Sequence, residues 1–431
     1  MGSFPTSSDP DRAADLPADF DLGEALAALR AAPDFASFRR SSFHRRHGAA
    51  LDAWVGKIRL HAPPRPPAPP PAPRDGAARG AASERILRIV QWNVEQGKAW
   101  DRLVEAVETT PQLRGADLWT LNEADLGTAR VANRDVAREL GQRLGLYSAF
   151  VANYLELTKG PGPDGEAPGE NAIGLHGIAL LSRWPLADAG FAAMPEIFDY
   201  FRFPLEKRYG VRKVLWATVR HPRGDFRLAT THLEVRSTPR QRAAQIAAAV
   251  AALPAGPAWL TGDWNTHTFR RGGRLASALE FLRLRRTDPA AFEALLLDPW
   301  EREPLLRVLA RSGFHLGPWN DRQPTVREVL SRVEELEQLP APLRDRFRRA
   351  FSLESKVLRM RLDWIAARGP WRPAPAAVAA AAEAAPAAPA DLSGSPAGSA
   401  AWTGVSLGPE GTRASDHAPI GVTAAWEDEP A

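Results

Sequence analysis

Short apolar runs that stop at clusters of polar residues constrain the fold of this chain more than any other feature. The clearest run is Ala258–Leu260, which predicts a buried strand that ends at Gly262. Asp263 and Asn265 follow two positions apart, and in an extended backbone such residues point to the same side. A carboxylate can take a proton from water, and a carboxamide can donate to a phosphoryl oxygen. For this segment alone, an Asp-capped turn after a strand is an equally good interpretation.

Four further clusters repeat the arrangement elsewhere in the chain. They are Gln91-Trp92-Asn93 after residues 86–90, Asn122-Glu123 after 116–121, Thr231-His232-Leu233 after 226–230, and Asp416-His417 before 418–420. Each cluster stands where a predicted strand ends or begins, and helical patterns such as 133–144 and 239–252 lie between the strands. In chain order the polar residues are therefore Asn, Glu, His, Asp-x-Asn and Asp-His.

This set of motifs resembles the signature of the endonuclease/exonuclease/phosphatase superfamily, which has the DNase I-like fold. The motifs are QWNV at 91–94, LNEAD at 121–125, THLE at 231–234, GDWNT at 262–266, SDHAP at 415–419 and the strand Leu362-Asp363-Trp364-Ile365. One such motif is a weak signal, but six in family order are a strong one. The resemblance runs from about Arg85 to Trp426 and implies a four-layer α/β sandwich of two mixed sheets flanked by helices.

The chain has 431 residues, which is enough for one large domain with appendages. We expect a helical, partly disordered N-terminal extension over residues 1–60 and a Pro/Ala-rich linker over 61–83. The catalytic domain is then expected over 84–426, with insertions at about 270–355 and 371–410. No internal repeat is visible in the sequence.

Composition narrows both the chemistry and the location of the protein. The chain has no cysteine, which excludes disulfides, thiolate catalysis and zinc–thiolate sites. Its net charge of +4 is a mild positive bias, which suits anionic substrates without identifying a nucleic-acid binder. We find no apolar stretch of membrane-spanning length and no secretory signal pattern, so we expect a cytoplasmic protein.

The resemblance implies hydrolysis of a phosphate ester assisted by a divalent cation, Mg²⁺, with Mn²⁺ as an alternative. Glu123 is the expected metal ligand, Asn93 is a second oxygen donor, and Asp416 is a carboxylate on the metal side. Asp263 would polarise the attacking water, and Asn265 would hold the phosphoryl oxygen.

The same resemblance assigns roles to two histidines. His417 would donate to the phosphate or act as general acid or base, and Asp363 would orient it through its second nitrogen. His232 would donate from the opposite side. A buried ion pair with a nearby arginine is an alternative for Asp363, and a hydrogen-bonded core histidine is one for His232. Arg212 and His176 are weaker candidates for substrate contacts, since a solvated strand end and a loop histidine explain them equally well.

We therefore expect a metal-dependent phosphodiesterase, nuclease or phosphatase. Two alternatives remain, namely a catalytically silent binding module of the same fold and a protein that docks nucleic acid through the basic segment 39–47. All the expected polar positions are filled, which favours the enzyme. Fold does not select the substrate, so DNA, RNA, inositol phosphates, lipids and small phosphodiesters stay open, as does the oligomeric state. The aromatic tract 200–203 either stacks on a base or lipid or packs under a loop.

Overall fold

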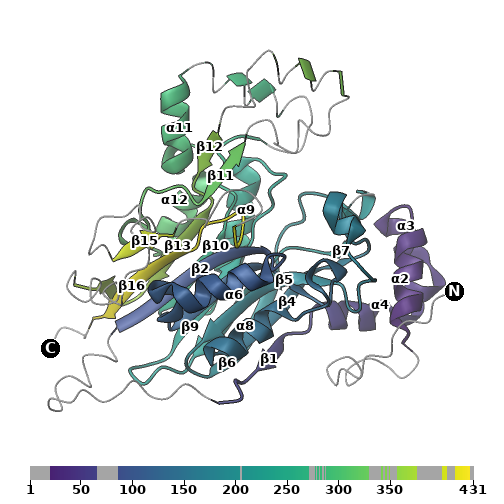
Figure 1. Ribbon diagram of the computed structural model, residues 1–431, viewed down its shortest axis with the longest axis horizontal. Coiled ribbons are helices and arrows are strands. Elements are labelled where there is room, and N and C mark those ends of the chain that lie inside the picture. The colour runs from purple at the N-terminus through teal and green to yellow at the C-terminus, as the bar shows by residue number, and fades with distance from the viewer. Residues whose placement is uncertain are drawn as a thin grey trace.

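Two β-sheets packed face to face form the centre of the molecule, as the computed structural model shows (Figure 1). The structure describes residues 20–65, 86–203, 206–270, 288–329, 357–375, 400–404 and 413–427, together with scattered positions within 277–286 and 341–349. Most of the predicted linker, parts of the predicted insertion at about 270–355 and most of the one at 371–410 lie outside these residues. Within them, no helix is both long and apolar enough to cross a bilayer.

The larger sheet has nine strands in the order β1-β4-β5-β3-β2-β16-β14, with β15 beside β16 and β7 beside β4. Their bounds are β1 Arg59–His61, β2 Ile86–Gln96, β3 Leu118–Leu126, β4 Tyr147–Glu156, β5 Leu175–Ser182, β7 Arg208–Gly210, β14 Trp371–Pro373, β15 Ala401–Thr403 and β16 Ile420–Trp426. The two central strands β2 and β3 are parallel, so their carboxyl ends reach the same edge of the sheet.

The smaller sheet has five strands in the order β13-β10-β9-β8-β6. Their bounds are β6 Leu186–Ala193, β8 Lys213–Val219, β9 Phe226–Thr231, β10 Ala258–Asp263 and β13 Asp363–Arg368. The core between the sheets contains Leu87, Leu118 and Leu180 from the larger one, and Leu228 and Ile365 from the smaller. Apolar side chains on both inner faces therefore join the two sheets into a sandwich.

Helices cover both outer faces of this sandwich. The larger sheet carries α6 (Trp100–Thr109), α7 (Pro111–Arg114) and α8 (Val136–Leu144), and the smaller one carries α9 (Pro239–Ala252) and α12 (Pro304–Arg311). Helix α9 begins at a capping box between Thr238 and Gln241, with Pro239 at its first position. The four-layer α/β sandwich predicted from the motifs is confirmed.

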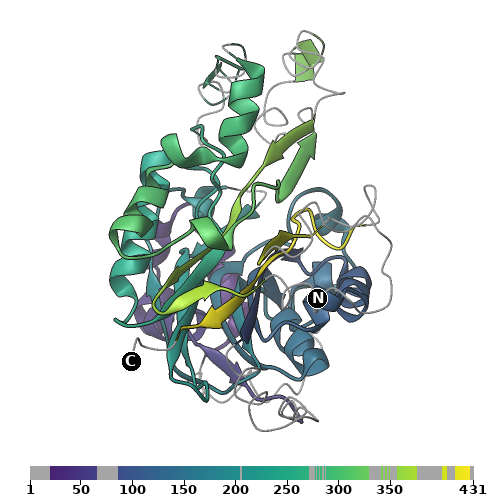
Figure 2. The same cartoon turned by 90° about the vertical axis from the view of Figure 1, so that its left-hand side faces the viewer.

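A small lobe extends from one end of the sandwich (Figure 2). It contains α11 (Pro289–Leu297) and the antiparallel pair β11 (Val326–Val329) and β12 (Val357–Met360). Single 3-10 turns complete the described elements: η1 Ala129–Val131, η2 Gly162–Glu166, η3 Tyr200–Arg202, η5 Pro299–Glu301 and η6 Gly317–Trp319. The base of the β11–β12 pair lies beside the C-terminal strand, because the backbone of Thr325 accepts from that of Ala418 at 2.8 Å.

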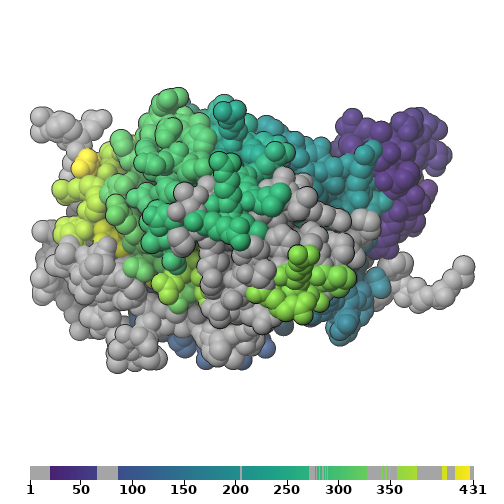
Figure 3. Space-filling view, turned by 90° about the horizontal axis from the view of Figure 1, so that it is seen from above, coloured from purple at the N-terminus to yellow at the C-terminus, as the bar shows by residue number. Residues whose placement is uncertain are grey.

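The N-terminal helices α2 (Leu22–Ala31), α3 (Phe35–Arg40) and α4 (Ser42–Val55) lie at the end of the molecule away from the C-terminal strand β16 (Figure 3). They lead into the edge strand β1, which pairs with β4. Arg30 Nε donates to the carbonyl of Leu157 at 2.7 Å, and Lys207 Nζ donates to the carbonyl of Ala32 at 2.6 Å. The described part of the N-terminal segment is thus hydrogen-bonded into the edge of the larger sheet.

Candidate active site

A layer of buried polar side chains joins the two sheets at the rim where β2, β3, β9 and β10 end. Asn122 stands at its centre, since its Oδ1 accepts from Gln91 Nε2 at 2.9 Å and from the backbone N–H of Asp263 at 2.6 Å. Gly262 is required here, because it has a φ of +147° and an added Cβ would lie 1.8 Å from the Thr231 carbonyl oxygen. The two sheets therefore meet closely enough for their terminal side chains to share one site.

The Asp263 carboxylate is the centre of that site and is only 2% exposed. Its Oδ2 lies 3.1 Å from Asn93 Nδ2, 3.3 Å from His232 Nε2 and 3.6 Å from His417 Nε2. Burial raises the pKa of Asp263 to about 7, against the opposing effect of His417. A carboxylate that gains and loses a proton near neutral pH suits general base catalysis.

His417 forms a hydrogen-bonded pair with Asp363. The distance from His417 Nδ1 to Asp363 Oδ2 is 2.7 Å, and Gln91 Nε2 lies 3.4 Å from the other carboxylate oxygen. Although burial opposes its charge, Asp363 and then Asp263 raise the pKa of His417 well above its usual range. Arg361 instead pairs with Asp321 at 2.5 Å, so the pairing of Asp363 with a neighbouring arginine is not what the structure shows.

Glu123 occupies a bulge in β3 and has a left-handed φ of +54°. Its two oxygens accept from Asn93 Nδ2, at 3.2 Å, and from Gln96 Nε2. A second bulge, in β2, brings Glu95 to the same place, where its Oε2 accepts from the backbone N–H of Asp416 at 3.0 Å. Burial, then Asp416 and also Glu123, raise the pKa of Glu95 to about 7. The carboxylates of Glu95, Glu123 and Asp416 therefore lie close enough to affect one another.

Two polar atoms of this group are buried without hydrogen-bond partners among the described residues. They are His232 Nδ1 and Arg212 Nη1. Burial and then the charge of Arg212 lower the pKa of His232 well below its usual range, which keeps this imidazole neutral, so it carries a single N–H, either at Nε2 towards Asp263 or at Nδ1. Buried polar atoms without a partner are rare in folded proteins, and the Arg212 guanidinium is therefore a candidate contact for an anionic ligand.

His176 in β5 is held by a carboxylate, as His417 is. Its Nδ1 lies 2.8 Å from Asp125 Oδ1, and Arg130 Nε contacts the other oxygen of Asp125 at 2.7 Å. Although burial opposes it, the charge of His176 and a hydrogen bond from Asn93 hold the pKa of Glu123 below its usual value. His176 is therefore a buried, positioned imidazole near Glu123.

Asn265 is tied to Asp263 through the backbone. Its N–H donates to Asp263 Oδ1 at 3.0 Å, and its Nδ2 donates to the carbonyl of Leu233 at 2.9 Å. Its φ is +50°, so it shares the left-handed conformation of Glu123. Backbone conformations of this kind gather at functional sites, where the surrounding structure holds them in place.

The structure thus brings the predicted residues to one rim. Direct contacts link seven of them: Asn93, Glu123, His232, Asp263, Asn265, Asp363 and His417. Asp416 is connected to this group through its hydrogen bond with Glu95. The charges of Arg212 and His176 act on the pKa values of His232 and Glu123. Sequence reasoning missed Glu95, Gln96, Gln91 and Asn122. A signal for Glu95 was present, since it follows Asn93 at the same two-residue spacing that separates Asp263 from Asn265.

Two groups of side chains compete as the place for a cation. Among the described residues, Asp263, Asp363 and His417 place one ligand atom each within 4.8 Å of one another. His417 already bridges the two carboxylates there, so a cation would have to break the 2.7 Å bond to Asp363. The carboxylates of Glu95, Glu123 and Asp416 form the second group, in which burial and then the charges of Asp416 and Glu123 raise the pKa of Glu95 while Lys98 and Arg413 oppose them. Such a set of oxygen ligands suits a hard divalent cation and leaves the bond between His417 and Asp363 intact.

Comparisons with known proteins give a family for the chain and several proteins of similar structure. The profile of the Endonuclease/Exonuclease/phosphatase family matches residues 90–417. A protein of that name from Beutenbergia cavernae DSM 12333 is similar in structure, with 17% identity, a TM-score of 0.43 and coverage of 80% of this chain and 73% of that one. The human Nocturnin catalytic domain with bound sulfate has 15% identity and a TM-score of 0.41, and the match covers 79% of this chain and 95% of that one. An AP endonuclease from Archaeoglobus fulgidus has 14% identity and a TM-score of 0.40, and the match covers 79% of this chain and 100% of that one. No curated protein sequence matches the chain.

Proposed function

Because the chain belongs to the endonuclease/exonuclease/phosphatase family, we propose that it hydrolyses a phosphate ester by attack of water with the help of a divalent cation. The observation that carries the proposal is the set of contacts made by Asp263, which lies within 3.6 Å of donors on Asn93, His232 and His417. One carboxylate surrounded by three donors is an arrangement that can hold a water against a phosphoryl group.

Each side chain then has a role that follows from its charge. Asp263, with its pKa near 7, takes the proton of the attacking water. His417 carries a positive charge and donates from Nε2 to a phosphoryl oxygen, where negative charge grows as the ester reacts. Asp363 acts through His417, because its hydrogen bond to Nδ1 fixes the orientation of the ring.

The opposite wall of the pocket binds the ester. Arg212 supplies an unpartnered donor and His232 supplies its single N–H, while Asn265 holds the loop against Asp263 and presents its carboxamide to the phosphoryl group. His176 is a further contact for the part of the substrate that lies beside Glu123. Together these residues fix the phosphate in line with the water that Asp263 activates.

Glu123, Glu95 and Asp416 are the residues that would hold the cation, with Asn93 as a neutral oxygen donor. Mg²⁺ suits such a set of oxygen ligands, and Mn²⁺ is the alternative. A divalent cation held there would neutralise the charge of the phosphate ester. The protein's own contribution is to keep the Glu123 carboxylate ionised and oriented, through the bonds from Asn93 and Gln96.

The test is hydrolysis of bis(p-nitrophenyl) phosphate by the full chain with Mg²⁺, with Mn²⁺ and with a chelator. We expect cation-dependent activity that Asp263→Asn and His417→Gln both abolish. His315→Gln is the matched control, since His315 is exposed and lies outside the site. Equal activity in all four proteins would refute the proposal.

Turnover and binding assays on the same proteins distinguish the competing functions. A catalytically silent binding module would bind DNA, RNA or inositol phosphates without turning over any of them, with either cation. A protein that docks nucleic acid through its N-terminal helices would show DNA binding that weakens with salt. The proposal includes a cytoplasmic location, which cell fractionation would test.

A further inference from the structure

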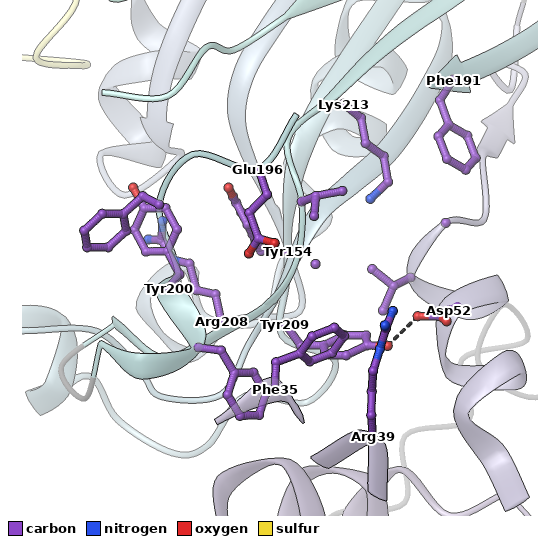
Figure 4. A pocket seen from close by; sticks show the side chains of 16 residues that line it. Phe35, Arg39, Asp52, Tyr154, Phe191, Glu196, Tyr200, Arg208, Tyr209 and Lys213 are labelled. Carbon is purple, nitrogen blue, oxygen red and sulfur yellow. Dashed lines mark hydrogen bonds between the residues drawn. The ribbon is translucent and has the colours of Figure 1, made fainter. Parts of the chain in front are cut away.

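A cavity of about 290 Å³ lies between the N-terminal helices and the edge of the sandwich, with Tyr154 and Tyr200 in its lining (Figure 4). Phe35 and Arg39 of α3 and Asp52 of α4 line one side, while Phe191 and Lys213 line the other. This volume is at the lower end of the range for small-molecule sites, which is roughly 300 Å³. None of the residues proposed above for hydrolysis lines it.

Specific ring contacts and a hydrogen bond form the wall of the cavity. The Phe35 ring lies 5.6 Å from that of Tyr209 and 5.8 Å from that of Phe201, and the Tyr209 hydroxyl donates to Asp52. These contacts join residues more than 150 positions apart in the sequence. The N-terminal helices therefore close the cavity with an ordered aromatic surface.

Two cations line the cavity without a carboxylate partner among the described residues. Lys213 is only 5% exposed, and its ammonium group donates to the carbonyl of Ala152 and lies 5.7 Å from the Phe191 ring. The Arg39 guanidinium lies 4.7 Å over the Phe35 ring. Both groups point into the cavity from opposite sides (Figure 4). Arg39 is exposed, whereas Lys213 is a buried cation without an ion pair among the described residues, which is unusual because burial without pairing is costly.

The carboxylates of the lining act on these cations without forming an ion pair with them. Asp52 accepts from Tyr209 while its charge acts on Lys213, and burial and then Asp199 raise the pKa of Glu196, an effect that the charge of Arg39 opposes. The rest of the surface is aromatic, so an incoming group with a flat ring would meet rings on several sides.

We propose that this cavity binds a small aromatic monoanion, whose acidic group lies between Lys213 and Arg39 and whose ring packs against Phe35, Phe191 and Tyr209. The site is separate from the one proposed for hydrolysis. The two share a wall, because Arg212 packs 5.5 Å over the Tyr154 ring and the Tyr200 hydroxyl donates to Glu234 at 2.9 Å, the residue that pairs with Arg212.

The probe is 1-naphthoate, titrated into the full chain by isothermal titration calorimetry, with the neutral 1-naphthalenemethanol as its uncharged counterpart. We expect one site for naphthoate, at least tenfold weaker binding of the alcohol, and at least tenfold weaker binding of naphthoate to Lys213→Met. Lys57→Met is the matched control, because it removes a nearby positive charge that does not line the cavity.

Two further variants test whether naphthoate binds in this cavity and not in the site proposed for hydrolysis. Val55→Phe fills the cavity from α4 without changing its charge, and we expect it to abolish naphthoate binding even if Lys213→Met does not fold. His417→Gln should bind naphthoate as the unmodified chain does. Failure of naphthoate to bind at millimolar concentration, equal binding to Lys213→Met or to Val55→Phe, or lost binding to His417→Gln would each overturn the proposal.

Discussion

Replacing Lys213 with methionine should make the protein more stable. The Lys213 side chain is buried among aromatic rings, and burial lowers its pKa from the ordinary 10.5 to about 8. At 1.36 kcal/mol per pH unit, this difference means that holding the charge in the folded state costs about 3 kcal/mol. Methionine keeps most of the apolar stem and removes the charge.

The substitution also removes a hydrogen bond, and this loss reduces the net gain in the free energy of unfolding. The Ala152 carbonyl loses the donor that Lys213 supplies, and a lost hydrogen bond of this kind costs about 1 kcal/mol. We therefore expect Lys213→Met to raise the free energy of unfolding by about 2 kcal/mol at pH 7.

The difference in stability between Lys213→Met and the unmodified protein should depend on pH. The pKa of Lys213 in the folded protein lies below that in the unfolded chain, so the penalty is fully present below pH 8. It disappears as the pH rises from about 8 towards 10.5, and the advantage of the variant should vanish over the same interval.

Equilibrium unfolding in urea at pH 7 and at pH 10, with Lys57→Met as control, measures the difference. If the unmodified protein is the more stable at pH 7, or if the difference does not change with pH, the Lys213 ammonium is not the uncompensated charge described above.

Four further results are expected from the structure. His417→Gln should lower kcat by about 10²-fold or more, and near-normal turnover of bis(p-nitrophenyl) phosphate would exclude its proposed role. Glu123→Gln should raise the Mg²⁺ concentration needed for half-maximal activity, and an unchanged metal titration would place the cation elsewhere. Arg242→Met should cost about 3–5 kcal/mol of stability, because it leaves the fully buried Glu303 unpaired, and a loss below 1 kcal/mol would contradict this. Phe38→Ala should cost about 3–5 kcal/mol within a single unfolding transition, whereas a separate early transition would show that the N-terminal helices unfold alone.

The motifs were sufficient to predict the sandwich, because each one ends a strand and the strands of both sheets deliver those ends to one rim. The positions of Glu95 and Gln96 were harder to predict, since a β-bulge with φ of +46° and +62° turns them towards Glu123. Strand periodicity does not reveal such a bulge, because it breaks the alternation on which the prediction depends.

The aromatic tract illustrates a second limit. Tyr200 and Phe201 are buried, as the packing interpretation requires, but their partners include Phe35 and Phe38 from the N-terminal helices. The helical spacing of Leu22, Ala25, Leu26 and Leu29 indicates that one face of α2 is buried, and it is. Helical spacing does not indicate what covers that face, because the contacts join distant parts of the chain.

The pairing of β1 with β4 has a practical consequence for anyone who shortens this protein. Removing the segment before residue 85 would strip a hydrogen-bonded neighbour from Ser148, Ala149 and Phe150 and uncover the rings that pack against α3. A bare strand of this kind readily pairs with another chain. Fragments designed to contain only the six motifs are thus expected to self-associate, and dimers found in such fragments would result from the truncation rather than from the native protein.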